Sequence, residues 1–301
     1  MTAPQSASAM SERLKGLLYM LGASICFSTG GLLVRLADAT PPAALLVWRS
    51  TVVFLFLALL LALWHGRELP SKIRDAGSGG VMAAVFLAAT FCFFIFAVTR
   101  TTVASAAALM STGPLMLTFA AWAFLGEKPR IATWIAIAAA LGGITLMFAD
   151  GLGSGGMIVG NLLALGIPAS FTASYILLRR SRGRLDPMIT SMLASAIAAL
   201  AILPFAWPIA WPAQDLAVIV AMGVTQTGMG LALMALAIHR LSAGELGMVG
   251  LLEMVLAPIW VWLALGERPN DTALVGAVIV VAAVFANQIY FLHLARRNPA
   301  A

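Results

Sequence analysis

Charged side chains are scarce in this sequence of 301 residues. Aspartate, glutamate, lysine and arginine make up 10% of it, hydrophobic residues make up 61%, and the mean hydropathy is +0.98. A soluble domain carries about 25% charged residues, so this chain has too few charges to cover a surface that faces water. Because apolar runs of membrane-spanning length recur along the chain, we expect an all-α integral membrane protein.

Other common features are missing as well. The alternation of polar and apolar residues that is typical of a membrane β-barrel is absent from runs such as TVVFLFLALLLALW at 51–64. No small-residue cleavage site follows the first apolar segment, which argues against a signal peptide. Cys26 and Cys92 both fall inside apolar spans, so they provide neither a disulfide framework nor a metal-ligand spacing.

The chain also lacks the motifs of enzymatic chemistry. H-E-x-x-H, G-x-S-x-G, Walker-type and Gly-rich dinucleotide motifs do not occur, and the three histidines fall at predicted span ends. We therefore expect no catalytic residue, no metal and no cofactor. The net charge of +6 does not indicate nucleic acid, because the lysines and arginines cluster in short loops between apolar segments, where they orient helices.

The sequence does contain ten apolar spans, separated by charged or Pro/Gly-rich turns. If the N-terminus is cytoplasmic, 14 of the 18 lysines and arginines face the cytoplasm, and only Arg35, Arg49, Arg100 and Arg268 face outward. This bias predicts a multi-pass membrane protein with both termini in the cytoplasm. The spans cover about 14–36, 43–64, 77–99, 103–125, 131–149, 157–178, 188–206, 215–238, 244–265 and 272–292.

An internal repeat relates the two halves of the chain. LGEKP at 125–129 returns as LGERP at 265–269, within a longer ungapped match at an offset of 140 residues. An upstream match at an offset of 144 residues aligns, among others, Phe27 with Phe171. Each LGE(K/R)P phrase should end a helix, because glycine permits the turn and proline prevents continuation. Its glutamate is expected to cap the helix or to pair with the adjacent base.

The repeat predicts two five-span halves, 14–152 and 153–293, with tails at 1–13 and 294–301. Because five is odd, the second half should enter the bilayer inverted. Inverted repeats of this kind build secondary transporters with a substrate site near the midplane. We expect spans one, three, four, six, eight and nine to surround a central cavity, with spans five and ten at the periphery.

These features resemble the drug/metabolite transporter superfamily, specifically its EamA family of ten-helix permeases. The doubled LGE(K/R)P after the fourth and ninth spans and PPAALLVWRS at 41–50 carry the resemblance, which covers nearly the whole chain. The chain is most similar to the YddG-type exporters, which implies efflux of small amino acids or related metabolites across a bacterial inner membrane. One departure is that Met254, and not proline, follows Glu253, with Pro258 later, so a helix break there should be displaced.

Polar, aromatic and helix-bending residues converge at the predicted bilayer centre. Polar groups in hydrocarbon need partners and should face inward. Taken singly, each serine or threonine could instead bond its own backbone or join neighbouring helices, and each aromatic could pack or face lipid. The candidates for lining a substrate cavity are Ser24, Phe27, Ser28, Ser111, Pro114, Phe171, Thr172, Tyr175, Gln226, Glu253 and Trp260.

Two charged residues fall inside predicted spans. Glu253 lies about ten residues from each end of the ninth span, where an ionised carboxylate is costly. It could bind a substrate ammonium or exchange a proton, or it could join helices structurally. Arg49, in the second span, could extend to the outer interface toward Asp38, or it could attract a substrate carboxylate at the outer mouth.

The sequence favours a secondary transporter that exports small metabolites, with amino acids as the expected class, by alternating access. The alternative is an integral-membrane enzyme acting on a lipid or polyprenyl substrate, which normally shows acidic or histidine clusters at one interface. A passive channel would require a ring of repeated polar residues. The expected partners are a small-molecule substrate and the lipid bilayer, without nucleic acid, and the protein should be a monomer or a homodimer.

Overall fold

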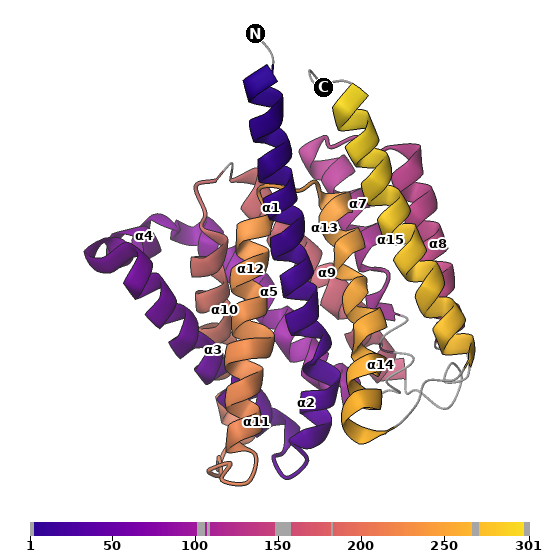
Figure 1. Ribbon diagram of the computed structural model, residues 1–301. Helices are drawn as coiled ribbons and strands as arrows, with labels where there is room; N and C mark the ends of the chain where they lie inside the picture. Colours follow the sequence, from indigo (N-terminus) through magenta and orange to yellow (C-terminus); the bar gives the residue numbers. More distant parts are fainter. Residues whose placement is uncertain are drawn as a thin grey trace.

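The computed structural model describes residues 3–100, 106, 109–147, 158–181, 183–266 and 271–297, and the regular elements in this part of the chain are helices (Figure 1). Seven helical stretches are long and apolar enough to cross a membrane. Three shorter apolar helices lie where the sequence predicts further spans. The chain is therefore an all-helical, multi-pass membrane protein.

The first half of the chain begins with two helices that meet at Thr29 and ends with a helix after the LGEKP phrase. In the fourth predicted span, a turn at Ser111 and Thr112 precedes the helix that begins at Gly113. Upstream of that turn, residues 106, 109 and 110 are helical, and 101–105, 107 and 108 lie outside the described residues. The helices are α1 (Ala3–Ser28), α2 (Gly30–Leu36), α3 (Pro42–His65), a 3-10 turn (Gly66–Glu68), α4 (Leu69–Asp75), α5 (Gly77–Val98), α7 (Gly113–Leu125) and α8 (Ile131–Met147).

The second half follows a similar order of long and broken helices. Its eighth predicted span is helical throughout but contains a π-helical segment, and its ninth is divided at Leu251. The elements are α9 (Ile158–Arg180), α10 (Pro187–Ala206), α11 (Leu216–Ala221), the π-helical segment (Met222–Gly228), α12 (Met229–Ala237), α13 (Ala243–Gly250), α14 (Leu252–Leu265) and α15 (Asp271–Arg297).

The two LGE phrases end helices, as the sequence predicts. Gly126 follows α7 with φ of 72°, and Gly266 follows α14 with φ of 75°. Both glycines adopt the left-handed conformation, which other residues adopt only at a cost, and this terminates the helix. Residues 267–270, including Glu267 and Pro269 of the second phrase, lie outside the described residues.

Helix packing places long-range pairs side by side. Helix α5 packs along α9, α1 along α12, α3 along α10, and α8 along α15. Helix α13 packs on α7, while α14 contacts α1 and α7 contacts α9. Both termini emerge at one end of the bundle (Figure 1), which we call the terminal end. At the opposite end, the Trp48 indole donates a hydrogen bond to the Ala210 carbonyl over 3.1 Å.

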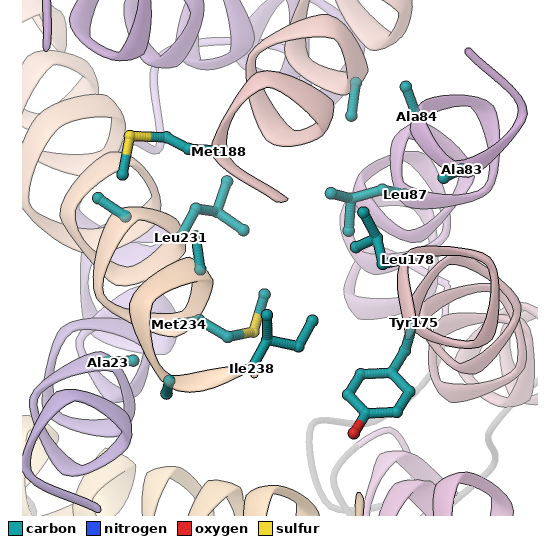
Figure 2. Close-up of a cluster of buried hydrophobic side chains, with 14 of the residues drawn as sticks. Ala23, Ala83, Ala84, Leu87, Tyr175, Leu178, Met188, Leu231, Met234 and Ile238 are labelled. Atoms are coloured by element: carbon teal, nitrogen blue, oxygen red, sulfur yellow. The ribbon is translucent and has the colours of Figure 1, made fainter. Parts of the chain in front are cut away.

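The main buried cluster lies where α5, α9, α10 and α12 meet (Figure 2). Leu87 of α5 and Tyr175 and Leu178 of α9 face Leu231 and Met234 of α12 across it. Many large apolar side chains elsewhere are exposed on the outside of the helices, as expected for surfaces that contact lipid rather than water.

Candidate functional site

A cavity of about 230 Å³ lies inside the bundle. Residues from α1, α3, α5, α7, α9, the π-helical segment, α12, α13 and α14 line it, whereas no lining residue comes from α8 or α15. Most of the wall is apolar. Its polar or charged side chains, among the described residues, are Arg49, Thr90, Gln226, Thr227 and Glu253. The cavity is thus a small, largely apolar chamber with a few polar groups, as is typical of ligand sites.

Five of the candidates selected from the sequence line this cavity. They come from both halves and from five different segments, so the fold brings together residues that are up to 226 positions apart. These residues are Phe27, Pro114, Phe171, Gln226 and Glu253.

Ser24, Ser28 and Trp260 do not line the cavity but connect helices beside it. The Ser24 hydroxyl lies 3.0 Å from the Met20 carbonyl and 3.1 Å from the Val249 carbonyl, which joins α1 to α13. The Trp260 indole donates to the Ser28 hydroxyl over 2.8 Å, which joins α14 to the end of α1. These contacts correspond to the alternative interpretation of such residues, helix-to-helix hydrogen bonding.

The other candidates, Ser111, Thr172 and Tyr175, are buried outside the cavity lining. Tyr175 is 1% exposed and lies one turn beyond Phe171 toward the terminal end. The Arg179 guanidinium lies 5.9 Å from the centre of its ring, within cation–π range. Tyr175 therefore belongs to the packed layer between the cavity and the terminal end.

Arg49 is located differently from the sequence-based expectation of an outer-mouth residue. It is 3% exposed and lines the central cavity, with its guanidinium carbon 5.8 Å from the centre of the Phe91 ring. Helix α3 begins at Pro42, so Arg49 lies about 10 Å along the helix axis. Close packing of α3 on the π-helical segment, where a Cβ on Gly223 would come within 2.4 Å of Val52, holds this face of α3 against the bundle interior.

Glu253 occupies the first turn of α14, immediately after the break at Leu251. The break precedes Glu253 and is not at Pro258, which remains inside α14. The positive end of a helix dipole favours a carboxylate at this position. Glu253 lines the cavity, and within the described part of the chain its carboxylate forms no hydrogen bond or ion pair.

Gln226 lies on the π-helical segment, a helix distortion that occurs frequently at functional sites. Its side-chain oxygen accepts a hydrogen bond from the Thr227 hydroxyl. The amide nitrogen packs against Gly30, where an added Cβ would lie 2.9 Å from it. The small residue at the start of α2 thus leaves room for the amide beside the cavity.

Four phenylalanines and four methionines contribute to the remaining wall, beside aliphatic, glycine and proline residues. Phe27 of α1 and Phe171 of α9 contribute one ring each, and Phe91 and Phe94 of α5 add two more. Such a wall can accommodate an apolar group of a ligand. The candidate site therefore combines an aromatic surface with one cationic and one anionic side chain.

Ion pairs link the cavity-lining helices at the terminal end. Arg13 of α1 donates to the Glu245 carboxylate of α13 over 2.8 and 2.5 Å. Glu127, after α7, accepts from Arg179 of α9 over 2.7 Å and from the backbone nitrogen of Ala243 over 3.2 Å. The sequence suggested that Glu127 caps a helix or pairs with an adjacent base. Glu127 caps the start of α13 through the Ala243 backbone nitrogen, and its basic partner is not the adjacent residue but Arg179, 52 residues away.

A polytopic helical bundle with a largely apolar internal chamber has the architecture of a membrane transporter. The model of the EamA-like transporter family matches this chain over residues 14–149 and again over 158–287. The chain therefore belongs to the EamA-like transporter family. This confirms the resemblance to the EamA family, and the closer resemblance to YddG-type exporters stays a prediction.

Similar proteins are described as transporters. The uncharacterized transporter YwfM of Bacillus subtilis is 33% identical over 198 residues, which cover 63% of this chain and 64% of that protein. The pseudopaline exporter CntI of Pseudomonas aeruginosa is 27% identical over 279 residues, covering 90% of this chain and 95% of CntI. A solved crystal structure shares the fold with a TM-score of 0.77 over 94% of this chain and 98% of the other, at 20% identity.

Proposed function

We propose that this protein is a secondary transporter that exports small metabolites, with amino acids as the expected class, across the bacterial inner membrane by alternating access. The observation that carries the proposal is the cavity, to which both halves of the chain contribute repeat-equivalent residues. A site shared between two inverted halves can be exposed to either side when one half moves against the other.

The equivalence is extensive within the cavity wall. Residues 144 positions apart in the upstream match, Phe27 and Phe171, both line the cavity. Residues 140 positions apart behave in the same way, both within the downstream match of 97–129 with 237–269 and just upstream of it at the same offset. These pairs are Leu87 and Thr227, Phe91 and Leu231, Phe94 and Met234, Met110 and Gly250, Gly113 and Glu253, and Pro114 and Met254.

Helix packing supports the same interpretation. If the first half is exchanged for the second, the contact between α1 and α12 becomes the contact between α9 and α5. The contact between α1 and α14 likewise becomes that between α9 and α7, and α8 with α15 is exchanged with itself. An inverted two-fold arrangement of ten spans would produce this pattern of neighbours.

The proposed cycle requires the terminal end to open. Beyond the cavity in this direction, the buried side chains of Tyr175, Leu178 and Ile238 surround a space of only about 10 Å³. The Arg13–Glu245 and Arg179–Glu127 pairs lie farther out. With the basic ends of the helices in the cytoplasm, the described conformation is closed on the cytoplasmic side. We propose that these contacts separate when the substrate enters for export.

Counterflow in liposomes tests the proposal. Purified protein is reconstituted with a high internal concentration of an unlabelled amino acid, and uptake of the labelled compound is followed across a panel that includes nucleobases and other metabolites. We expect transient accumulation of at least one labelled compound, recovered unchanged. Recovery of a chemically altered product would instead indicate a membrane enzyme, and no exchange of any compound by folded protein would refute transport.

A further inference from the structure

We propose that Arg49 and Glu253 bind the two opposite charges of a single zwitterionic substrate, with Arg49 on a carboxylate and Glu253 on an ammonium group. This inference rests on the proposed transport function and specifies the chemistry of its substrate. Its basis is that one small cavity contains both an arginine and a glutamate, neither of which has a counter-ion in the described part of the chain.

Arg49 requires an anionic partner. Its side chain is buried, and its Nε atom has no hydrogen-bond acceptor among the described residues. A guanidinium remains charged under ordinary conditions, and burial of an unpaired charge is costly. The face of Phe91 contributes a weak cation–π contact, but it does not accept the N–H groups. A carboxylate in the cavity would satisfy them with bidentate geometry.

Glu253 presents the complementary requirement. Its carboxylate faces the same cavity, and no lysine, arginine or histidine among the described residues lies within ion-pair distance of it. The α14 N-terminus favours its negative charge, but a helix dipole contributes less than a paired cation. A substrate ammonium is therefore the natural partner, because it supplies both charge and hydrogen-bond donors.

The rest of the wall limits what else the substrate carries. Arg49 and Glu253 form no ion pair with each other, so a ligand that bears both charges can lie between them. Phe27, Phe94 and Phe171 provide an apolar surface for a hydrophobic side group. The cavity volume, about 230 Å³, is below the range of about 300–1,000 Å³ of drug-sized sites. These features fit a small α-amino acid with an apolar side chain.

The test compares leucine with two analogues that each lack one charge. Leucinamide retains the ammonium but lacks the carboxylate, and N-acetyl-leucine retains the carboxylate but lacks the ammonium. In reconstituted wild-type protein, we expect leucine to compete with labelled leucine roughly ten- to a hundredfold better than either analogue, because each analogue leaves one buried charge unpaired.

Two variants assign the charges to the residues. Arg49→Gln should remove the preference for leucine over leucinamide but retain the preference over N-acetyl-leucine, and Glu253→Gln should do the reverse. Arg49→Lys should retain part of the carboxylate preference. Arg100→Gln, at an exposed arginine that does not line the cavity, is the matched control and should leave both preferences unchanged.

Equal competition by leucine and both analogues in the wild-type protein would overturn the inference without the need for any variant, so a variant that fails to fold does not obstruct the test. A proportionate loss of all three compounds in both glutamine variants would also overturn it. Counterflow of a non-zwitterionic metabolite, without competition by amino acids, would overturn the zwitterion assignment but leave the transport proposal standing. The absence of counterflow for every compound would refute transport itself.

Discussion

The ion pair between Arg13 and Glu245 provides the sharpest test of how the cavity opens. Glu245 lies in the first turn of α13, where it accepts two hydrogen bonds from Arg13 of α1 and also accepts from the backbone nitrogen and hydroxyl of Ser242. Glu245→Gln removes the negative charge but keeps a side-chain oxygen that can still cap α13. The variant therefore weakens the link between α1 and α13 while leaving the local helix start largely intact.

The structure sets the magnitude of this effect. The Arg13 and Glu245 side chains are 15% and 7% exposed, so their pair is closer to a buried than to a surface pair. Breaking a buried pair costs about 3–5 kcal/mol and losing an exposed one about 0.2–1 kcal/mol, and we expect about 2–3 kcal/mol here. If the pair exists only when the terminal end is closed, its loss shifts the equilibrium toward the open state by roughly 30- to 150-fold.

Cysteine labelling measures that shift. With Cys26 and Cys92 replaced by alanine, a single cysteine at Met234 lies in the cavity wall below the closing layer. In membrane vesicles, Glu245→Gln should increase the rate at which a membrane-impermeant thiol reagent reaches this cysteine from the cytoplasmic side. Exchanging the two charges, Arg13→Glu with Glu245→Arg, should restore slow labelling. Unchanged labelling with a lowered Tm would show that the pair only stabilises the fold, and would refute this account of opening.

Three further predictions concern packing, helix coupling and pH. Gly230→Ala should lower Tm and transport, since its Cβ would come within 2.5 Å of the Phe27 ring. In the control Gly31→Ala, the added Cβ meets no atom within 4 Å, and the substitution should be neutral. Equal effects of the two substitutions on Tm would contradict this prediction. Ser28→Ala removes the acceptor for the Trp260 indole of α14 and should reduce the free energy of unfolding by about 1 kcal/mol. Denaturant titration in detergent measures this change. An unchanged midpoint would show that the hydrogen bond contributes nothing to stability. Burial, together with neighbouring arginines, lowers the pKa of His239, so the unfolded chain binds its proton more readily and stability should fall as the pH drops through about 6.5. His239→Gln should flatten the dependence of Tm on pH. The same slope in the variant and the wild-type protein would refute the assignment of this dependence to His239.

Sequence reasoning worked best where a single residue or a single helix carries the information. The left-handed glycines Gly126 and Gly266 end their helices because the backbone requirement is local. Phe27 and Phe171, aligned by the repeat, both line the cavity. Glu253 also lines it, because a carboxylate at that depth must face the interior rather than lipid.

The same reasoning was less informative about which helix a residue would meet. Ser24 and Ser28 share a helix face with Phe27, but they bond to neighbouring helices instead of lining the cavity. Arg49 was expected near the outer surface, because a long side chain can extend several ångströms toward water. Thr90 and Thr227 were not selected as cavity residues, although Thr227 directly follows Gln226, which was selected.

Hydropathy alone predicted that this chain is a multi-pass helical membrane protein, and the repeated LGE(K/R)P phrase, together with PPAALLVWRS at 41–50, indicated its family. These properties depend on composition and on short-range order, which the sequence states directly. Tertiary structure alone decided that Arg49 and Glu253 share one chamber and that Glu127 pairs with Arg179. In a bundle whose helices are apolar on both the lipid-facing and the inner side, hydropathy does not distinguish one apolar face from another. The close packing of small residues between helices makes that distinction, and it is settled only when the helices assemble.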